Sequence, residues 1–220
     1  MALTRLRSVS CILAALLTLP SQILAFDTPL SDTAIREAYF MGQRHDDSTA
    51  KFLDSYYKHL PPPKSGPYIS SVAILTPYAL VVMNTSKQIG HYSAQQAQID
   101  HRDRRETVLC IIEIQLTESY PAFIPDPASR TTPPGFIPRS YDFWTYFQFH
   151  LLDSDKELRP FSSVGHPNYF CSDEGGCTLT GATVQFEFYA DSFPTTDATV
   201  QIEPPEGESL ELNFDLASVR

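Results

Sequence analysis

Glycine is scarce in this chain: only nine of the 220 residues are glycine. Loops that cradle phosphate need closely spaced glycines, and neither G-x-x-x-x-G-K-[ST] nor G-x-G-x-x-G occurs. The G-x-S-x-G elbow of hydrolases and the H-E-x-x-H helix of zinc proteases are missing as well. The common motifs for nucleotide binding, for that class of hydrolysis and for zinc proteolysis are therefore excluded.

Long apolar runs are also lacking, because a membrane-spanning helix needs roughly 20 apolar residues. The short apolar run at residues 11–19 follows two arginines and precedes a small residue, Ala25. This three-part pattern is typical of a secretory signal peptide. We expect residues 1–25 to be removed, which leaves a secreted or periplasmic chain of residues 26–220 without a transmembrane segment. A retained N-terminal anchor is the alternative.

Cysteine is rare, and three cysteines follow the expected signal peptide. Cys171 and Cys177 enclose a short stretch with two glycines, so we predict a disulfide across a tight turn in an oxidising compartment. Cys110 lies in the apolar run ETVLCIIEIQL, which predicts a buried free thiol. A zinc site would need a fourth ligand and a second close pair, and the sequence offers neither.

Basic residues are few in the second half of the chain. Residues 106–220 hold five Lys and Arg against eighteen Asp and Glu, whereas residues 26–105 hold nine against eight. Nucleic acids and anionic lipids bind positively charged surfaces, so we expect no nucleic-acid partner. High net charge also keeps proteins soluble, so the acidity need not mark a binding surface. The change near residue 105 divides the chain into two regions.

Residues 26–105 show mainly helical patterns, with apolar positions at a spacing of three and four. Capping side chains precede them: Ser31 or Asp32, the group at residues 46–48, Thr76 and Ser93. We place His45, Asp46 and Asp47 at a helix start and not in a metal site. The expected helices cover residues 33–44, 48–60, 77–88 and 94–105, with a short strand at residues 68–75.

After residue 105 the hydrophobic period changes from 3.6 to 2. Strands are expected at residues 108–116, 143–151, 158–164, 184–188, 199–203 and 210–215. Strands with one apolar face need a second sheet to cover that face. We therefore predict an α+β fold in which the N-terminal helical segment, residues 26–105, packs on an antiparallel immunoglobulin-like β-sandwich of residues 106–220.

Acidic groups in this region offer no clear site. Asp153, Asp155 and Glu157 could bind calcium weakly, but they lack the glycine and the distal glutamate of an EF-hand loop, so a solvated hairpin turn is simpler. Glu187 and Glu211 fall on outward faces of strands, where solvated charges are expected. We assign no catalytic, cofactor-binding or metal-ligating residue from the sequence.

A proline-rich stretch at residues 118–140 contains six prolines, and its apolar side chains include Phe123, Ile124, Phe136 and Ile137, with Tyr141 just after it. Loops of this length within a compact domain are usually functional or disordered. The stretch either presents a recognition surface or covers an open end or edge of the sandwich.

Four short segments suggest a relationship: LSDTAIREAYF at residues 30–40, MGQR at 41–44, TPY at 76–78 and YSAQ at 92–95. They resemble a group of short secreted bacterial proteins of unknown function, associated with Acidobacteria. The resemblance implies a bacterial exported protein. It implies no activity, and no functional residues can be carried over from it.

Two functions are consistent with these observations. The preferred hypothesis is a non-enzymatic binding or structural module of the cell envelope, without a cofactor, whose partner is an envelope or extracellular protein or glycan. The alternative is a hydrolase-like enzyme with a site in a cleft between the helical part and the sheet. His91 and His101 would then be the first residues to test.

Overall fold

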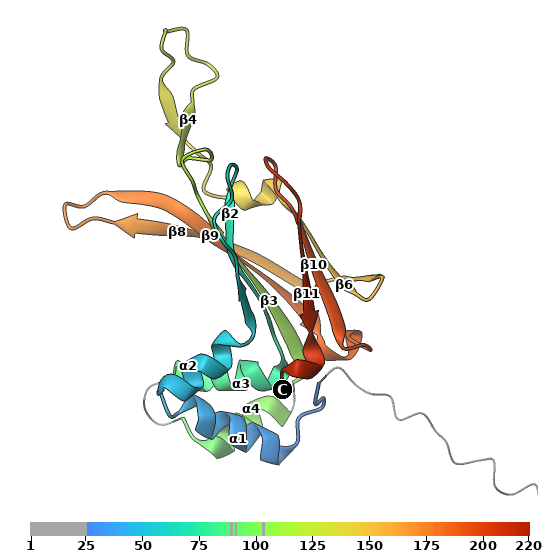
Figure 1. Ribbon diagram of the computed structural model, residues 1–220. Helices are drawn as coiled ribbons and strands as arrows, with labels where there is room; N and C mark the ends of the chain where they lie inside the picture. Colours follow the sequence, from blue (N-terminus) through green and yellow to red (C-terminus); the bar gives the residue numbers. More distant parts are fainter. Residues whose placement is uncertain (1–25, 89, 91, 103) are drawn as a thin grey trace, which may run out of the picture.

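The computed structural model describes residues 26–88, 90, 92–102 and 104–220. The predicted signal peptide and His91 lie outside these residues. Four helices of the described chain gather at one end of two antiparallel sheets (Figure 1). They are α1 (Asp32–Gly42), α2 (Asp47–Asp54), α3 (Pro77–Ser86) and α4 (Ala94–Arg102). None of these helices is long and apolar enough to cross a bilayer.

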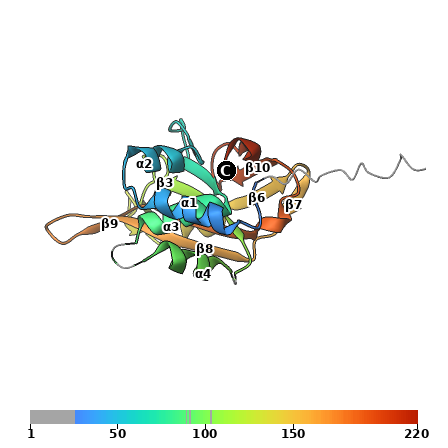
Figure 2. The same ribbon diagram turned by 90° about the horizontal axis from the view of Figure 1, so that it is seen from below.

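The helices begin where the capping residues predicted. The Ser31 side chain accepts a hydrogen bond from the Ala34 amide, and the Asp46 carboxylate accepts from the amides at residues 48 and 49. Thr76 caps α3 in the same way, with Pro77 in its first turn. Seen from this end, α1 and α3 lie across the ends of the strands (Figure 2).

The second helix is shorter than predicted: it ends at Asp54, and Tyr57–His59 form strand β1. Phe52 and Tyr56 are four residues apart, a spacing that fits both a helical and a strand period. The tertiary contacts decide here, because β1 pairs with residues 71–73 of the neighbouring strand. Tyr56 is buried at this turn, and its hydroxyl donates to the backbone oxygen of Arg220.

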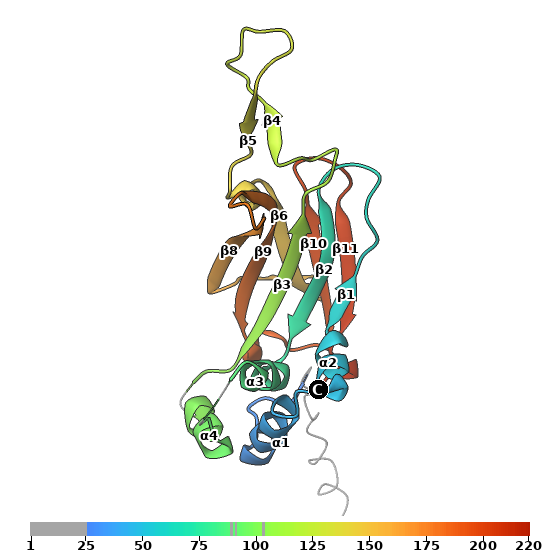
Figure 3. The ribbon, with the colours of Figure 1, turned by 90° about the vertical axis from the view of Figure 1, so that its left-hand side faces the viewer.

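The large sheet has five strands in the order β1-β2-β3-β9-β8. The second sheet has four strands in the order β11-β10-β6-β7, and β4 and β5 form a separate hairpin (Figure 3). All strand pairs are antiparallel, which confirms the α+β class. Strands β1 and β2 come from the mainly helical range yet belong to the same sheet as β3. The remaining bounds are β2 (Tyr68–Leu75), β3 (Thr107–Gln115), β4 (Phe123–Pro125), β5 (Phe136–Pro138), β6 (Gln148–Asp153), β7 (Lys156–Leu158), β8 (Ser162–Cys171), β9 (Cys177–Tyr189), β10 (Asp197–Glu203) and β11 (Leu210–Asp215).

The two sheets face each other across one hydrophobic core. Alternate residues of β3, including Cys110 and Ile112, meet Val200 and Ile202 of the second sheet in this core. The opposite face of β3 is also buried, because Leu109 and neighbouring apolar residues pack with residues of α3. This double burial explains why the sequence of β3 is almost continuously apolar.

The strand predicted at residues 143–151 is partly wrong, because Phe143–Tyr146 form a 3₁₀ helix and β6 begins only at Gln148. Phe143 and Phe147 are both buried. Their spacing of four residues fits period 2 as well as a helical turn, so alternation could not distinguish the two structures.

The strand predicted at residues 158–164 is also wrong, because it joins parts of two sheets. Strand β7 ends at Leu158, and β8 begins at Ser162 in the other sheet. Pro160 lies between them and lacks the amide that would continue a ladder. Strand β9 is longer than the predicted 184–188, since glycine and polar residues extend it to Cys177.

Two hairpins project from the body (Figure 1). The β8–β9 hairpin carries the Cys171–Cys177 disulfide at its tip, as predicted, and Cys110 is the buried free cysteine of the described chain. The proline-rich stretch forms the β4–β5 hairpin, which extends away from the helical end (Figure 3). It therefore projects from the sheets instead of covering them.

Candidate functional site

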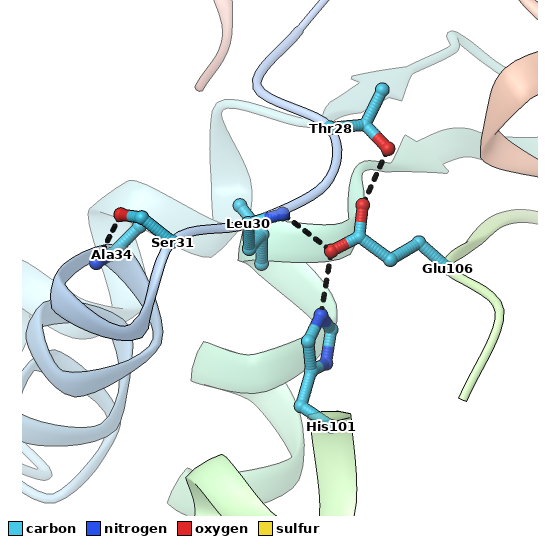
Figure 4. A network of polar contacts seen from close by, with 6 residues as sticks. All are labelled: Thr28, Leu30, Ser31, Ala34, His101 and Glu106. Atoms are coloured by element: carbon cyan, nitrogen blue, oxygen red, sulfur yellow. Dashed lines mark hydrogen bonds and ion pairs between the residues drawn. The ribbon is translucent and has the colours of Figure 1, made fainter. Parts of the chain in front are cut away.

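Polar side chains meet at the junction between the helices and the sheets (Figure 4). The Glu106 carboxylate, just before β3, accepts hydrogen bonds from the Thr28 hydroxyl at 2.5 Å, the Leu30 amide at 2.6 Å and His101 Nε2 at 2.7 Å. The Glu106 side chain is 8% exposed and the His101 side chain 18%. We call these four residues the Glu106 network.

One local contact and two long-range contacts form the network. Helix α4 ends at Arg102 and β3 begins at Thr107, and His101 in the last turn of the helix contacts Glu106, which directly precedes the strand. Leu30 precedes the α1 cap, Ser31, whose side chain accepts from the Ala34 amide (Figure 4). The network therefore joins the N-terminal segment, α4 and the large sheet at one carboxylate.

The carboxylate is held in its charged form. Burial alone would raise the pKa of Glu106, but hydrogen bonds from His101, Thr28 and the Leu30 amide outweigh burial and lower this pKa below its usual value. Donors that favour the ionised form are worth more when they are shielded from water. The charge of Glu106 is thus part of the folded structure at neutral pH.

The order of the groups differs from that of a nucleophilic triad. Such a triad places the histidine between the nucleophile and the acid, so that the imidazole can take the nucleophile's proton. Here the carboxylate lies between the other two groups, and the Thr28 hydroxyl donates to Glu106 and not to His101. The geometry fits a role in fastening residues 28–30 to the body of the protein.

Two of the three acidic residues of the β6–β7 hairpin, Asp153 and Glu157, bind different partners. Asp153 is buried and accepts from the Thr195 amide at 3.2 Å and from its hydroxyl at 2.7 Å. Glu157 instead pairs with His150 Nδ1 at 2.6 Å. Within the described residues, no three His, Cys, Asp or Glu side chains gather closely enough to hold a metal ion.

Exposed aromatic side chains lie on the projecting hairpins, and those of the proline-rich stretch are among the residues for which the sequence offered a recognition surface as one of two alternatives. Phe123 and Phe136 are 51% and 68% exposed, and the register pairs them with Pro138 and Pro125. All four residues lie on one face of the hairpin, because side chains alternate along a strand. The signal in the sequence was the repeated tripeptide FIP, at residues 123–125 and 136–138. The β8–β9 hairpin adds exposed Tyr169 and Phe170.

A cavity of about 310 Å³ lies between the two sheets, and its lining includes no residue of the Glu106 network. Its walls come from strands β3 and β9 of the large sheet and β6, β7 and β10 of the smaller one. Sequence reasoning could not find it, because the residues that line it are far apart in the chain.

A search against models of protein families finds no match to this chain, and a search of curated proteins finds none either. The functional argument therefore depends on the geometry of the described residues.

Proposed function

We propose that this protein is an exported, non-enzymatic binding module with an immunoglobulin-like frame, which holds a partner protein through its projecting β4–β5 hairpin. The exposed pair Phe123 and Phe136 on one face of that hairpin is the observation that carries the proposal. Export is supported by the signal-like pattern at residues 1–25 and by the disulfide, which fits an oxidising compartment.

The strand order supports the immunoglobulin-like frame. Constant immunoglobulin domains have the sheets A-B-E-D and C-F-G, and a C′ strand can follow C at the edge. The order β2-β3-β9-β8 corresponds to A-B-E-D, and β11-β10-β6-β7 corresponds to G-F-C-C′. In this comparison, β1 is an addition at the sheet edge, and α3 and α4 are an insertion between strands A and B.

The same correspondence favours the end opposite the helices as the binding end. In variable immunoglobulin domains, the B–C and F–G loops at one end form part of the binding site. The B–C connection of this chain contains the β4–β5 hairpin, and residues 204–209 form the F–G connection at the same end (Figure 1).

The hairpin is held before any partner arrives. At its base, the Arg139 guanidinium lies 3.5 Å from the centroid of the buried Tyr120 ring, and Arg139 Nε donates to the Pro121 oxygen. Near its far end, the Asp126 amide donates to the Gly135 oxygen. A rigid aromatic pair loses little conformational entropy on binding, and such residues dominate protein interfaces.

Paired variants test the proposal. The F123S/F136S double variant removes the exposed aromatic pair, and F40S removes a 56% exposed phenylalanine from α1 at the opposite end of the molecule. Each full chain, checked for an unchanged melting temperature, is used to retain envelope and extracellular proteins. We expect one partner that the wild type and F40S retain and F123S/F136S loses. Equal retention by all three chains, or no partner of the wild type, would refute the role of the hairpin.

A further inference from the structure

We infer that the cavity between the sheets is a binding site for a small ligand with one apolar chain and one carboxylate, which Arg159 holds at the mouth. This site is independent of the projecting hairpins. Its volume of about 310 Å³ is at the lower end of the range for small-molecule sites. The cavity therefore suits a single short chain better than a two-chain lipid.

The inner part of the cavity is apolar. Cys110, Ile112, Phe188 and Val200 line it and are almost completely buried. Burial raises the pKa of the Cys110 thiol to about 12, so the floor carries no charge near neutral pH. An apolar chain that enters this space removes its own surface and the apolar lining from water, and this favours binding.

Two aromatic rings on opposite sheets form a wall of the cavity. The rings of Phe149 on β6 and Phe186 on β9 are tilted, with centroids 5.3 Å apart, and both side chains are partly exposed. Arg159 and Pro160 also line the cavity, and they belong to the segment that crosses from one sheet to the other after β7 ends at Leu158. Because the proline cannot extend the ladder, this crossing places polar groups beside the apolar cavity.

Arg159 lines the cavity and has no carboxylate partner among the residues that the structure describes. His150 Nδ1 and the Glu157 carboxylate lie 2.6 Å apart and bind each other diagonally across the β6–β7 pair. The ladder ends at the pair Leu151 and Leu158, and Arg159 is the next residue along the chain and lines the cavity. Arg159 is exposed, and none of the ion pairs between described residues includes it.

This arrangement selects the charge of the ligand head. A guanidinium binds a carboxylate through two parallel hydrogen bonds, which fixes orientation as well as charge. The lining residues include one arginine, Arg159, and one acidic residue, Glu157, so a head with several negative charges would find a single guanidinium to pair with. A single negative charge, a monocarboxylate, matches one arginine.

Calorimetric titration of the full chain with decanoate tests the site. We expect one decanoate per chain for the wild type and binding about tenfold weaker for R159Q, since a charge-assisted hydrogen bond is lost. The variant R130Q is the matched control, because it removes the same charge from an exposed arginine on the β4–β5 hairpin, and it should bind as the wild type does. Decyltrimethylammonium, with the same chain and the opposite charge, should not bind.

A second variant tests the location. V200F fills the cavity with a larger side chain, and we expect the folded variant to lose decanoate binding. If V200F fails to fold, the comparison of R159Q with R130Q still decides the head-group contact. Absence of decanoate binding by the wild type, equal affinities of R159Q and R130Q, or unchanged binding by a folded V200F would each overturn the proposal.

Discussion

Replacing Glu106 by alanine tests whether the N-terminal segment is fastened to the body through one carboxylate. The substitution removes the acceptor of three hydrogen bonds, from Thr28, Leu30 and His101. A hydrogen bond contributes about 1 kcal/mol net, and more when its acceptor is charged, so the loss should be about 3 kcal/mol. With an m-value of roughly 2 kcal/mol/M, the urea midpoint should fall by about 1.5 M.

Two further variants show whether the loss of stability is specific to the Glu106 carboxylate. E106Q keeps the shape of the side chain but removes its charge, so we expect a loss of about 1.5 kcal/mol. E208A removes a glutamate at an exposed position between β10 and β11 and should change the free energy of unfolding by less than about 0.5 kcal/mol. An E106A midpoint equal to that of E208A would refute the reasoning.

The pH dependence follows from the lowered pKa of Glu106 in the folded protein. Between the folded and unfolded values of this pKa, the unfolded chain binds more protons, so the contribution to stability grows with pH. The difference between wild type and E106A should be complete above about pH 5 and should shrink as the pH falls below the ordinary glutamate value. Urea unfolding at several pH values measures the difference in the free energy of unfolding between wild type and E106A. If this difference grew as the pH fell, the charge assigned to Glu106 would be contradicted.

Two other predictions concern the long β8–β9 hairpin. In G181A, the added Cβ would lie 2.1 Å from the backbone oxygen of Ile114, so we expect the free energy of unfolding in urea to fall by about 2 kcal/mol. In the control G176A, the added Cβ would meet nothing closer than 3.8 Å. An equally large fall in the free energy of unfolding of G176A would contradict the steric explanation. Removing the disulfide by C171S/C177S should cost about 2 kcal/mol, because the closed loop is short. Non-reducing peptide mapping should link Cys171 to Cys177, and two alkylatable thiols in the native chain would refute the pairing.

The helix starts could be predicted because the information is local. Ser31, Asp46 and Thr76 each accept a hydrogen bond from an amide two or three residues further along, so the sequence alone contains the whole interaction. The same holds for the disulfide, whose two cysteines are six residues apart. Strand β2 was also predicted with its observed bounds, since threonine and proline at residues 76–77 mark where it ends.

The β4–β5 hairpin in the proline-rich stretch could not be predicted from local sequence patterns. Its strands have only three residues each and contain proline, so neither alternation nor strand propensity distinguished them from an irregular loop. Pairing between the two FIP tripeptides forms the hairpin, and this pairing is a contact across ten intervening residues.

The sequence by itself determined the helix caps, the alternating faces of the central strands, the disulfide and the acidic character of residues 106–220, because each of these depends on near neighbours or on composition. Only the tertiary structure decided which strands share a sheet, that Glu106 meets Thr28 and Leu30, and that Arg159 stands beside an apolar cavity. Glu106 lies 78 residues from Thr28 and 76 residues from Leu30 in the sequence, and the cavity is lined by strands of both sheets. Contacts at such separations depend on how the whole chain buries its apolar surface, which no local pattern of residues specifies.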